Sequence, residues 1–112
     1  MGNFFQSEMV RGDIQEMAVL QEFCFRSLTN LALLNKEKKM EYFEALRKLI
    51  EKQKIFYARI QLSDDPEAKS VAENMKNSVV MLGGNPNLSV MDMFDDLLKK
   101  IDQFESHVEK QQ

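Results

Sequence analysis

The chain has 112 residues, a net charge of −3, 44% hydrophobic and 29% charged residues, which is typical of one globular domain over residues 1–112. Its single histidine and single cysteine leave little for hydrolytic or metal-centred catalysis, and one cysteine excludes an internal disulfide. No apolar run is long enough to span a membrane, and residues 1–6 do not resemble a secretory signal. We therefore expect a cytoplasmic, non-enzymatic protein with no cofactor, metal or membrane partner.

The first predicted helix covers residues 8–34. Ser7 is a good N-cap, and the apolar residues that follow it have helical spacing. This stripe consists of Val10, Ile14, Met17, Cys24, Leu28 and Leu31. Gly12 weakens the first turns, so a start at Asp13, itself a competent N-cap, is the alternative.

The second predicted helix covers residues 36–62, with Asn35 as its N-cap. Its apolar face consists of Tyr42, Phe43, Leu46, Leu49, Ile50, Phe56, Tyr57 and Ile60. Gln53 lies in the middle of this face, four residues before Tyr57, and we expect the two to set the packing register through a buried hydrogen bond. The one-residue link between the helices favours an antiparallel hairpin over one bent rod.

Two shorter helices follow. Asp65 is the predicted N-cap and Pro66 the first residue of a helix over 66–82, which two glycines end. Ser89, with an acid three residues later, resembles a capping box before a helix over 90–109. There is no strand pattern. The predicted fold is an all-α helical bundle, in which a long antiparallel hairpin packs with two shorter helices.

The first two predicted helices are longer than the last two. The first two helices would each span about 40 Å, whereas the last two would reach only about 25–30 Å. The long pair is apolar almost throughout, so something has to bury its overhang. We consider the N-terminal arm, residues 1–7 with Phe4 and Phe5, and a second copy of the chain. The sequence thus predicts a self-associating homo-oligomer.

Positive charge is concentrated in the second helix. Residues 36–59 hold eight Lys or Arg against four Glu, a net of +4, so that −3 overall leaves −7 for the rest. On a helical wheel the cations fall on two edges with an acidic ridge between them, and Glu44 and Lys48 have the spacing of an ion pair. This arrangement favours a solvent-exposed face on which the cations pair with carboxylates of the same chain. The alternative is a regulator that docks an anionic partner, nucleic acid or an acidic host protein, through Lys48, Lys52 and Arg59.

Two acidic regions also have competing interpretations. Acids of the fourth helix suggest metal ligation, but Phe104 precedes His107 by three residues, so the Glu-x-x-His motif of di-iron bundles is absent. Before the third helix, Asp65 is expected to act as a cap, whereas Asp64 is a candidate for an exposed recognition corner with Ser63 and Arg59. The role of Asp64 stays open.

Three stretches carry a resemblance to a known family: residues 4–10, FFQSEMV; residues 49–59, LIEKQKIFYAR; and residues 62–68, LSDDPEA. Together they resemble a family of small proteins of unknown function from cyanobacteria and their phages, domain of unknown function 1825. The resemblance implies a helical fold, no assigned catalytic residues, and a cyanobacterial or phage origin. It implies no reaction, so the predicted function is a small interaction protein of unknown role.

Overall fold

The computed structural model describes residues 7–110, which form four α-helices and one short 3-10 turn. The elements are α1 (Glu8–Leu28), η2 (Leu31–Leu33), α2 (Lys36–Ile60), α3 (Ala68–Met81) and α4 (Val90–Glu109). No strand occurs within this described part of the chain, so the all-α class is confirmed. Between residues 7 and 110, no helix is both long and apolar enough to cross a membrane.

The first helix is shorter than expected. It begins at Glu8, which excludes the alternative start at Asp13, but it ends at Leu28 instead of near residue 34. Thr29 and Asn30 explain the early end, because polar side chains of this size compete for backbone hydrogen bonds. The hydroxyl of Thr29 donates to the carbonyl oxygen of Arg26 at 2.7 Å, and Asn30 has a φ of −132°, outside the helical range. The chain then continues as η2.

The other helix ends differ from the prediction by about a turn or less. Helix α2 ends at Ile60 rather than residue 62, and α3 begins at Ala68 because Pro66 and Glu67 form a turn before it. Helix α3 ends at Met81 instead of residue 82. The range of α4 agrees with the predicted 90–109.

Capping side chains define two of the helix starts. The side-chain oxygen of Asn35 accepts a hydrogen bond from the backbone N–H of Lys38 at 2.9 Å. The hydroxyl of Ser89 accepts one from the N–H of Asp92 at 3.2 Å. Ser7 occupies the N-cap position of α1, yet its side chain makes no cap hydrogen bond.

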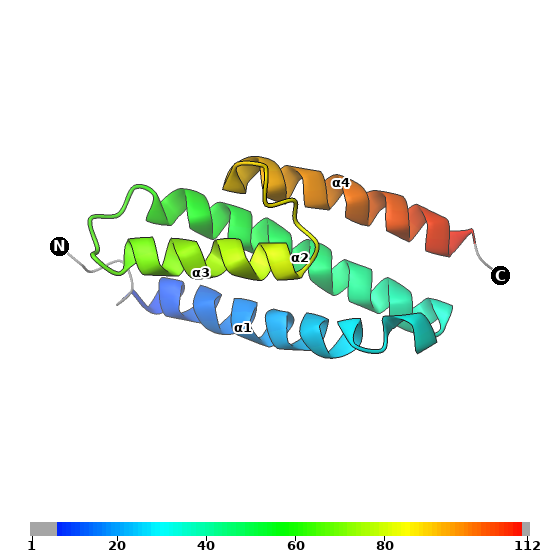
Figure 1. Cartoon of the computed structure of the whole chain (residues 1–112). Helices are drawn as coiled ribbons and strands as arrows, with labels where there is room; N and C mark the ends of the chain where they lie inside the picture. The colour runs from blue at the N-terminus through cyan, green and yellow to red at the C-terminus, as the bar shows by residue number, and fades with distance from the viewer. Residues whose placement is uncertain (1–6, 111–112) are drawn as a thin grey trace.

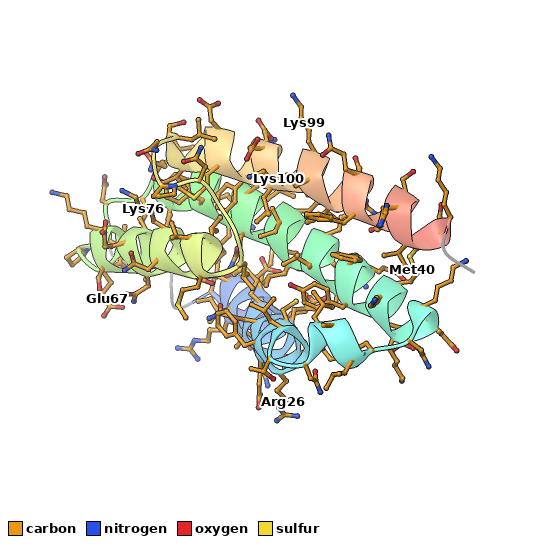
Figure 2. All side chains as sticks on the ribbon, turned by 45° about the vertical axis from the view of Figure 1, so that its right-hand side comes forward. Arg26, Met40, Glu67, Lys76, Lys99 and Lys100 are labelled. Atoms are coloured by element: carbon orange, nitrogen blue, oxygen red, sulfur yellow. The ribbon has the colours of Figure 1, made fainter. Side chains whose placement is uncertain are left out.

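Helix α2 is the centre of the fold and contacts the other three helices (Figure 1). It runs antiparallel to α1 and α4, as the predicted hairpin requires, while α1, α3 and α4 all run in the same direction. The molecule measures 54 × 29 × 19 Å, so its thinnest dimension is about two helix diameters. Leu49 and Ile50 of α2 are fully buried at this centre. Charged side chains project outward, as Lys99 and Arg26 do in Figure 2.

The length difference lies in one helix rather than in a pair. Helix α1 has 21 residues and α4 has 20, so both span about 30 Å. Helix α3 has only 14 residues, about 21 Å, and it covers one half of α2, near Ile60. The prediction that the first two helices are both longer than the last two is therefore wrong, because α1 and α4 have nearly the same length. The half of α2 near Lys36 lacks the layer that α3 provides elsewhere.

Candidate functional site

An apolar groove of about 450 Å³ opens where α3 ends, and we call it the end groove. Its floor comes from Tyr42, Phe43 and Leu46 of α2. Leu28 of α1 and Phe104 of α4 stand on opposite sides of it. The other lining residues are Leu31, Leu82, Gly83, Leu97, Lys100 and Ile101. The groove lies where a longer α3 would have packed.

Aromatic rings line the groove from its floor to its rim. Phe43 stacks on Phe104 with ring centroids 5.8 Å apart and an interplanar angle of 18°, and Tyr42 packs edge-on against Phe43 at 5.1 Å. Phe43 is 8% exposed, whereas Phe104 is 52% exposed. The stack therefore carries apolar surface from the core to the solvent.

The floor of the groove is uncharged at neutral pH. Tyr42 is buried, and burial, with a smaller effect of Cys24, raises its pKa from 10.0 to about 12. Cys24 of α1 is also fully buried, and burial raises the pKa of its thiol from 9.0 to about 11. A thiol is nucleophilic only as the thiolate, so Cys24 is a small buried apolar side chain. The end groove offers shape and apolar surface rather than reactive groups.

One edge of α2 forms ion pairs with α1. Nζ of Lys52 lies 3.0 Å from a carboxylate oxygen of Glu16, and the guanidinium of Arg59 lies 3.5 Å from that of Asp13. Lys48, the third predicted recognition cation, is exposed and has no carboxylate of residues 7–110 within 4.0 Å. The Glu44–Lys48 ion pair suggested by the spacing is thus not formed.

The other edge of α2 forms ion pairs with α4. Arg47 pairs with Asp102 and, at 2.8 Å, with Glu105, and Lys54 pairs with Asp95. The two basic edges of the helical wheel therefore face two different acidic helices. Four of the eight cations of residues 36–59 thus form ion pairs with carboxylates of α1 or α4 inside the molecule.

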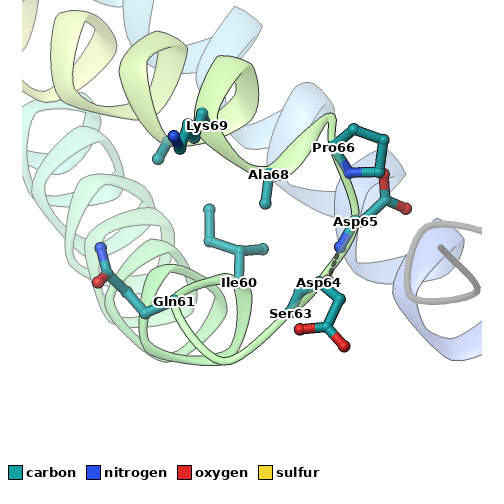
Figure 3. A pocket seen from close by; sticks show the side chains of 9 residues that line it. Ile60, Gln61, Ser63, Asp64, Asp65, Pro66, Ala68 and Lys69 are labelled. Carbon is teal, nitrogen blue, oxygen red and sulfur yellow. Dashed lines mark hydrogen bonds between the residues drawn. The ribbon is translucent and has the colours of Figure 1, made fainter. Parts of the chain in front are cut away.

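The corner between α2 and α3 is built by local hydrogen bonds (Figure 3). The hydroxyl of Ser63 accepts a hydrogen bond from the N–H of Asp65 at 3.0 Å, and the carboxylate of Asp65 accepts one from the N–H of Glu67 at 3.0 Å. Glu67 occupies the N-cap position of α3, so the prediction of Asp65 as the N-cap is wrong, and the buried carboxylate of Asp65 stabilises the turn before the helix instead. Asp64 is exposed. Ser63, Asp64 and Asp65 line a shallow pocket of about 520 Å³. Arg59 is not part of its lining, because it pairs with α1.

The predicted interface residues do not come together. Gln53 is 2% exposed and faces a pocket between α1, α2 and α3, whereas Tyr57 packs edge-on against Phe94 of α4, with ring centroids 6.0 Å apart. Oε1 of Gln53 has no hydrogen-bond partner in the described residues, so the expected bond to Tyr57 through this atom is absent. Phe4 and Phe5 lie outside the described residues.

The sequence prediction missed the groove residues Leu28 and Phe104 as a site. Leu28 was expected in the apolar stripe of the first helix, and Phe104 was considered for its spacing to His107; the early ends of α1 and α3 leave both partly exposed. Within residues 7–110, no group of three His, Cys, Asp or Glu side chains lies close enough to hold a metal ion. Asp95, Asp96 and Asp102 of α4 instead pair with Lys54, Lys100 and Arg47.

Comparison with known proteins adds the family but no activity. No curated protein and no solved structure matches the chain. The sequence model of one family, described as Domain of unknown function (DUF1825), matches residues 2–108. Because the match covers almost the whole sequence, including α1, α2, α3 and nearly all of α4, the chain belongs to the DUF1825 family.

Proposed function

We propose that this protein is a non-catalytic interaction protein that self-associates by burying the end groove against a second copy of the chain. The observation that carries the proposal is the aromatic stack of Phe43 and Phe104, which leaves one ring half-exposed on the rim of an apolar groove. Contiguous exposed apolar surface in a small protein typically marks an interaction site. A cytoplasmic location and a cyanobacterial or phage origin stay predictions.

The reach of the chain argues for a second copy as the occupant. Residues 1–6 precede α1 in the sequence, whereas Leu28 of the groove lies at the other end of α1, about 30 Å from its start. Six fully extended residues span at most about 20 Å. Residues 1–6 by themselves are therefore too short to cover the groove as far as Leu28. In an antiparallel pair, the start of α1 in one copy lies beside the groove of the other.

A stable dimer needs an interface larger than the end groove. Such an interface takes about 800 Å² from each partner, roughly a tenth of the 7353 Å² surface of this chain. The groove alone is too small for this. Exposed apolar residues also occur close in sequence to the lining: Leu33 is two residues after Leu31, and Met81 directly precedes Leu82. We expect them to form the rim of the contact.

The alternative function, docking of an anionic partner through α2, has weaker support. Lys52 and Arg59 are engaged with Glu16 and Asp13, and only Lys48 among the three stands without an ion pair in the described residues. An anionic surface would have to compete with these carboxylates. Tracking of phosphates needs several adjacent cations, so we do not propose nucleic acid as the partner.

The mass of the protein in solution tests the proposal. We expect light scattering at 10–100 µM to give about twice the 13.1 kDa of the single chain. Phe104→Ser removes the exposed ring of the groove and is expected to shift the protein to the single-chain mass. Ile55→Ser is the matched control, because Ile55 is 62% exposed on α2 but lies outside the groove.

Two results would overturn the proposal. One is a strictly monomeric wild-type protein throughout this concentration range. The other is a dimer that Phe104→Ser leaves intact while Ile55→Ser dissociates it, because the contact would then lie on another face. Circular dichroism of each variant establishes that the helices are retained.

A further inference from the structure

A second pocket, of about 260 Å³, lies between α1, α2 and α3 and is distinct from the end groove. Its buried wall consists of Met17 of α1, Gln53 and Phe56 of α2, and Met75 and Ser78 of α3. More exposed residues, such as Ile14 and Asn74, surround its opening. Three helices thus bring uncharged polar side chains, the buried Gln53 and Ser78 and the more exposed Gln21 and Asn74, together with apolar side chains in one pocket.

Two buried polar atoms of this pocket have no partner. Gln53 is 2% exposed and Ser78 is 8% exposed, and neither Oε1 of Gln53 nor Oγ of Ser78 makes a hydrogen bond within residues 7–110. Buried polar atoms in proteins nearly always have a partner, because losing their hydrogen bonds to water is costly. An apolar side chain at either position would avoid this cost. Both residues instead belong to the lining of the same pocket.

The lining residues also indicate whether a ligand of this pocket is charged. Among the described residues, no Lys, Arg, His, Asp or Glu lines the pocket. A charged ligand would lose its hydration without gaining a counter-ion, which is strongly unfavourable. The amide group of Gln53 both donates and accepts hydrogen bonds, and the hydroxyl of Ser78 does the same. The volume lies just below the usual range for ligand pockets, so a single ring with one polar group is an appropriate size.

We propose that this pocket binds a small, uncharged, amphipathic ligand that gives a hydrogen bond to Gln53 and exchanges one with Ser78. A neutral primary amide on an aromatic or aliphatic body has this chemistry. The apolar body packs against Met17, Phe56 and Met75, and the amide meets the two unpartnered atoms. The site is independent of self-association through the end groove.

Methionine methyl groups report directly on the pocket. Met17 and Met75 belong to its lining, whereas Met40 and Met81 do not. We would label the full-length protein with ¹³C-methyl methionine and titrate it with benzamide as the probe. Benzoate has nearly the same shape but carries a charge, so it serves as the matched control ligand.

We expect benzamide to shift the Met17 and Met75 signals with a Kd in the millimolar range, while Met40 and Met81 stay unchanged. Benzoate is expected to bind at least tenfold more weakly. Gln53→Met and Ser78→Ala are each expected to weaken benzamide binding at least fivefold. Gln103→Met, a polar-to-apolar change at an exposed position of α4, leaves binding unchanged.

Stability provides a second readout without any ligand. Removing a buried side-chain oxygen without a partner is expected to raise the Tm of Gln53→Met by about 4 °C. Absence of any shift at Met17 and Met75, equal binding of benzamide and benzoate, or undiminished binding in both variants overturns the proposal. A lower Tm in both Gln53→Met and Ser78→Ala also overturns it, because the two groups would then have structural partners.

Discussion

The two halves of α2 contain similar apolar residues but have different surroundings. Near its end, Phe56 and Ile60 are almost fully buried, with α1, α3 and α4 around them. Near its start, Tyr42 and Phe43 are also buried, yet the groove above them is open at the half-exposed ring of Phe104. The difference shows that the length of α3, and not the sequence of α2, determines which half of the molecule has a free apolar face.

The end of α3 is specified by two adjacent glycines. Gly83 has a φ of +112°, which side-chain-bearing residues rarely adopt, and its N–H donates to the carbonyl oxygen of Val80 at 3.0 Å. The N–H of Gly84 donates to Val79 at 2.9 Å. These bonds satisfy carbonyl groups of the last turn and direct the chain back toward α4. The boundary between the covered half and the groove half is therefore encoded locally.

Two phenylalanines of α4 provide the strongest test of this comparison. Phe94 is fully buried over the covered half, so Phe94→Ala is expected to lower the free energy of unfolding by about 3–5 kcal/mol. Phe104 lies over the groove and is half-exposed, so Phe104→Ala is expected to cost the isolated chain less than about 1 kcal/mol. Urea denaturation at low protein concentration measures both values. Equal losses would mean that the groove half is as well packed as the other.

The glycine that closes α3 gives the next largest effect. A Cβ at Gly84 would lie 2.7 Å from the side chain of Met93 and 2.9 Å from that of Val79, and both of these residues are fully buried. We expect Gly84→Ala to cost about 3 kcal/mol, because the core has to shift. Gly12→Ala is the control, since within residues 7–110 no atom outside its own helix lies within 4 Å of the new Cβ.

The control has an expected result of the opposite sign. Gly12→Ala is expected to stabilise the protein by about 0.5–1 kcal/mol, because alanine favours the helix and Gly12 lies within α1. Thermal unfolding of both variants at the same concentration measures the contrast. Gly84→Ala with wild-type stability would show that the approach of α3 to α4 is looser than described.

Alkaline pH tests whether the floor of the groove half is dry. Cys24 and Tyr42 have their pKa raised by burial, to about 11 and about 12 in the folded chain. The folded state therefore retains protons that the unfolded state releases. Their contribution to stability is full below pH 9, and it is lost as the pH rises through about 12. For Cys24 alone the loss is on the order of 2 kcal/mol.

Urea denaturation at pH 8 and at pH 11 measures this loss. Cys24→Ala is expected to lose less stability between the two pH values than the wild-type protein. The thiol should also react slowly with a disulfide reagent until the chain unfolds. A variant with unchanged pH dependence, or rapid labelling of the folded protein, would indicate that water reaches the floor.

The smallest effect is expected at the corner that leads into α3. The carboxylate of Asp65 accepts the N–H of Glu67, so Asp65→Ala is expected to cost about 1 kcal/mol. Asp64 is exposed, and Asp64→Ala is expected to change stability by less than about 0.5 kcal/mol. Thermal unfolding ranks the two variants. The reverse ranking would assign the structural role to Asp64 and leave Asp65 as the candidate for recognition.

Periodicity and caps were enough to predict the four helices and the hairpin. The stripe from Val10 to Cys24 and the cap at Asn35 are local signals, and local signals determine where a helix starts. The early end of α1 depended on Thr29 and Asn30. Each of these side chains competes only weakly for the backbone hydrogen bonds of the helix, so neither residue alone is a clear stop signal. The apolar periodicity extended past them to Leu31 and concealed the boundary.

The sites were less predictable than the fold. The end groove exists because α3 stops beside Leu82, and its lining is drawn from three helices far apart in the sequence. No pattern within one helix shows that Phe104 lacks a neighbour. Gln53 was recognised as unusual, but its counterpart Ser78 was not, because a single serine on an apolar face is a weak signal. Its importance appears only where α2 and α3 meet.

The uneven directions of the helices give the molecule an electrical polarity along its length. At one end lie the starts of α1 and α3 with the end of α2, and at the other lie the ends of α1 and α4 with the start of α2. Each helix start carries about half a positive charge and each helix end about half a negative one. The end of the molecule with two helix starts and one helix end therefore keeps about half a positive charge, and the opposite end keeps about half a negative charge. Two copies placed antiparallel bring these opposite poles together. In the proposed dimer these dipoles would favour the orientation in which each groove faces the start of α1 in the other copy, and salt is expected to weaken that preference.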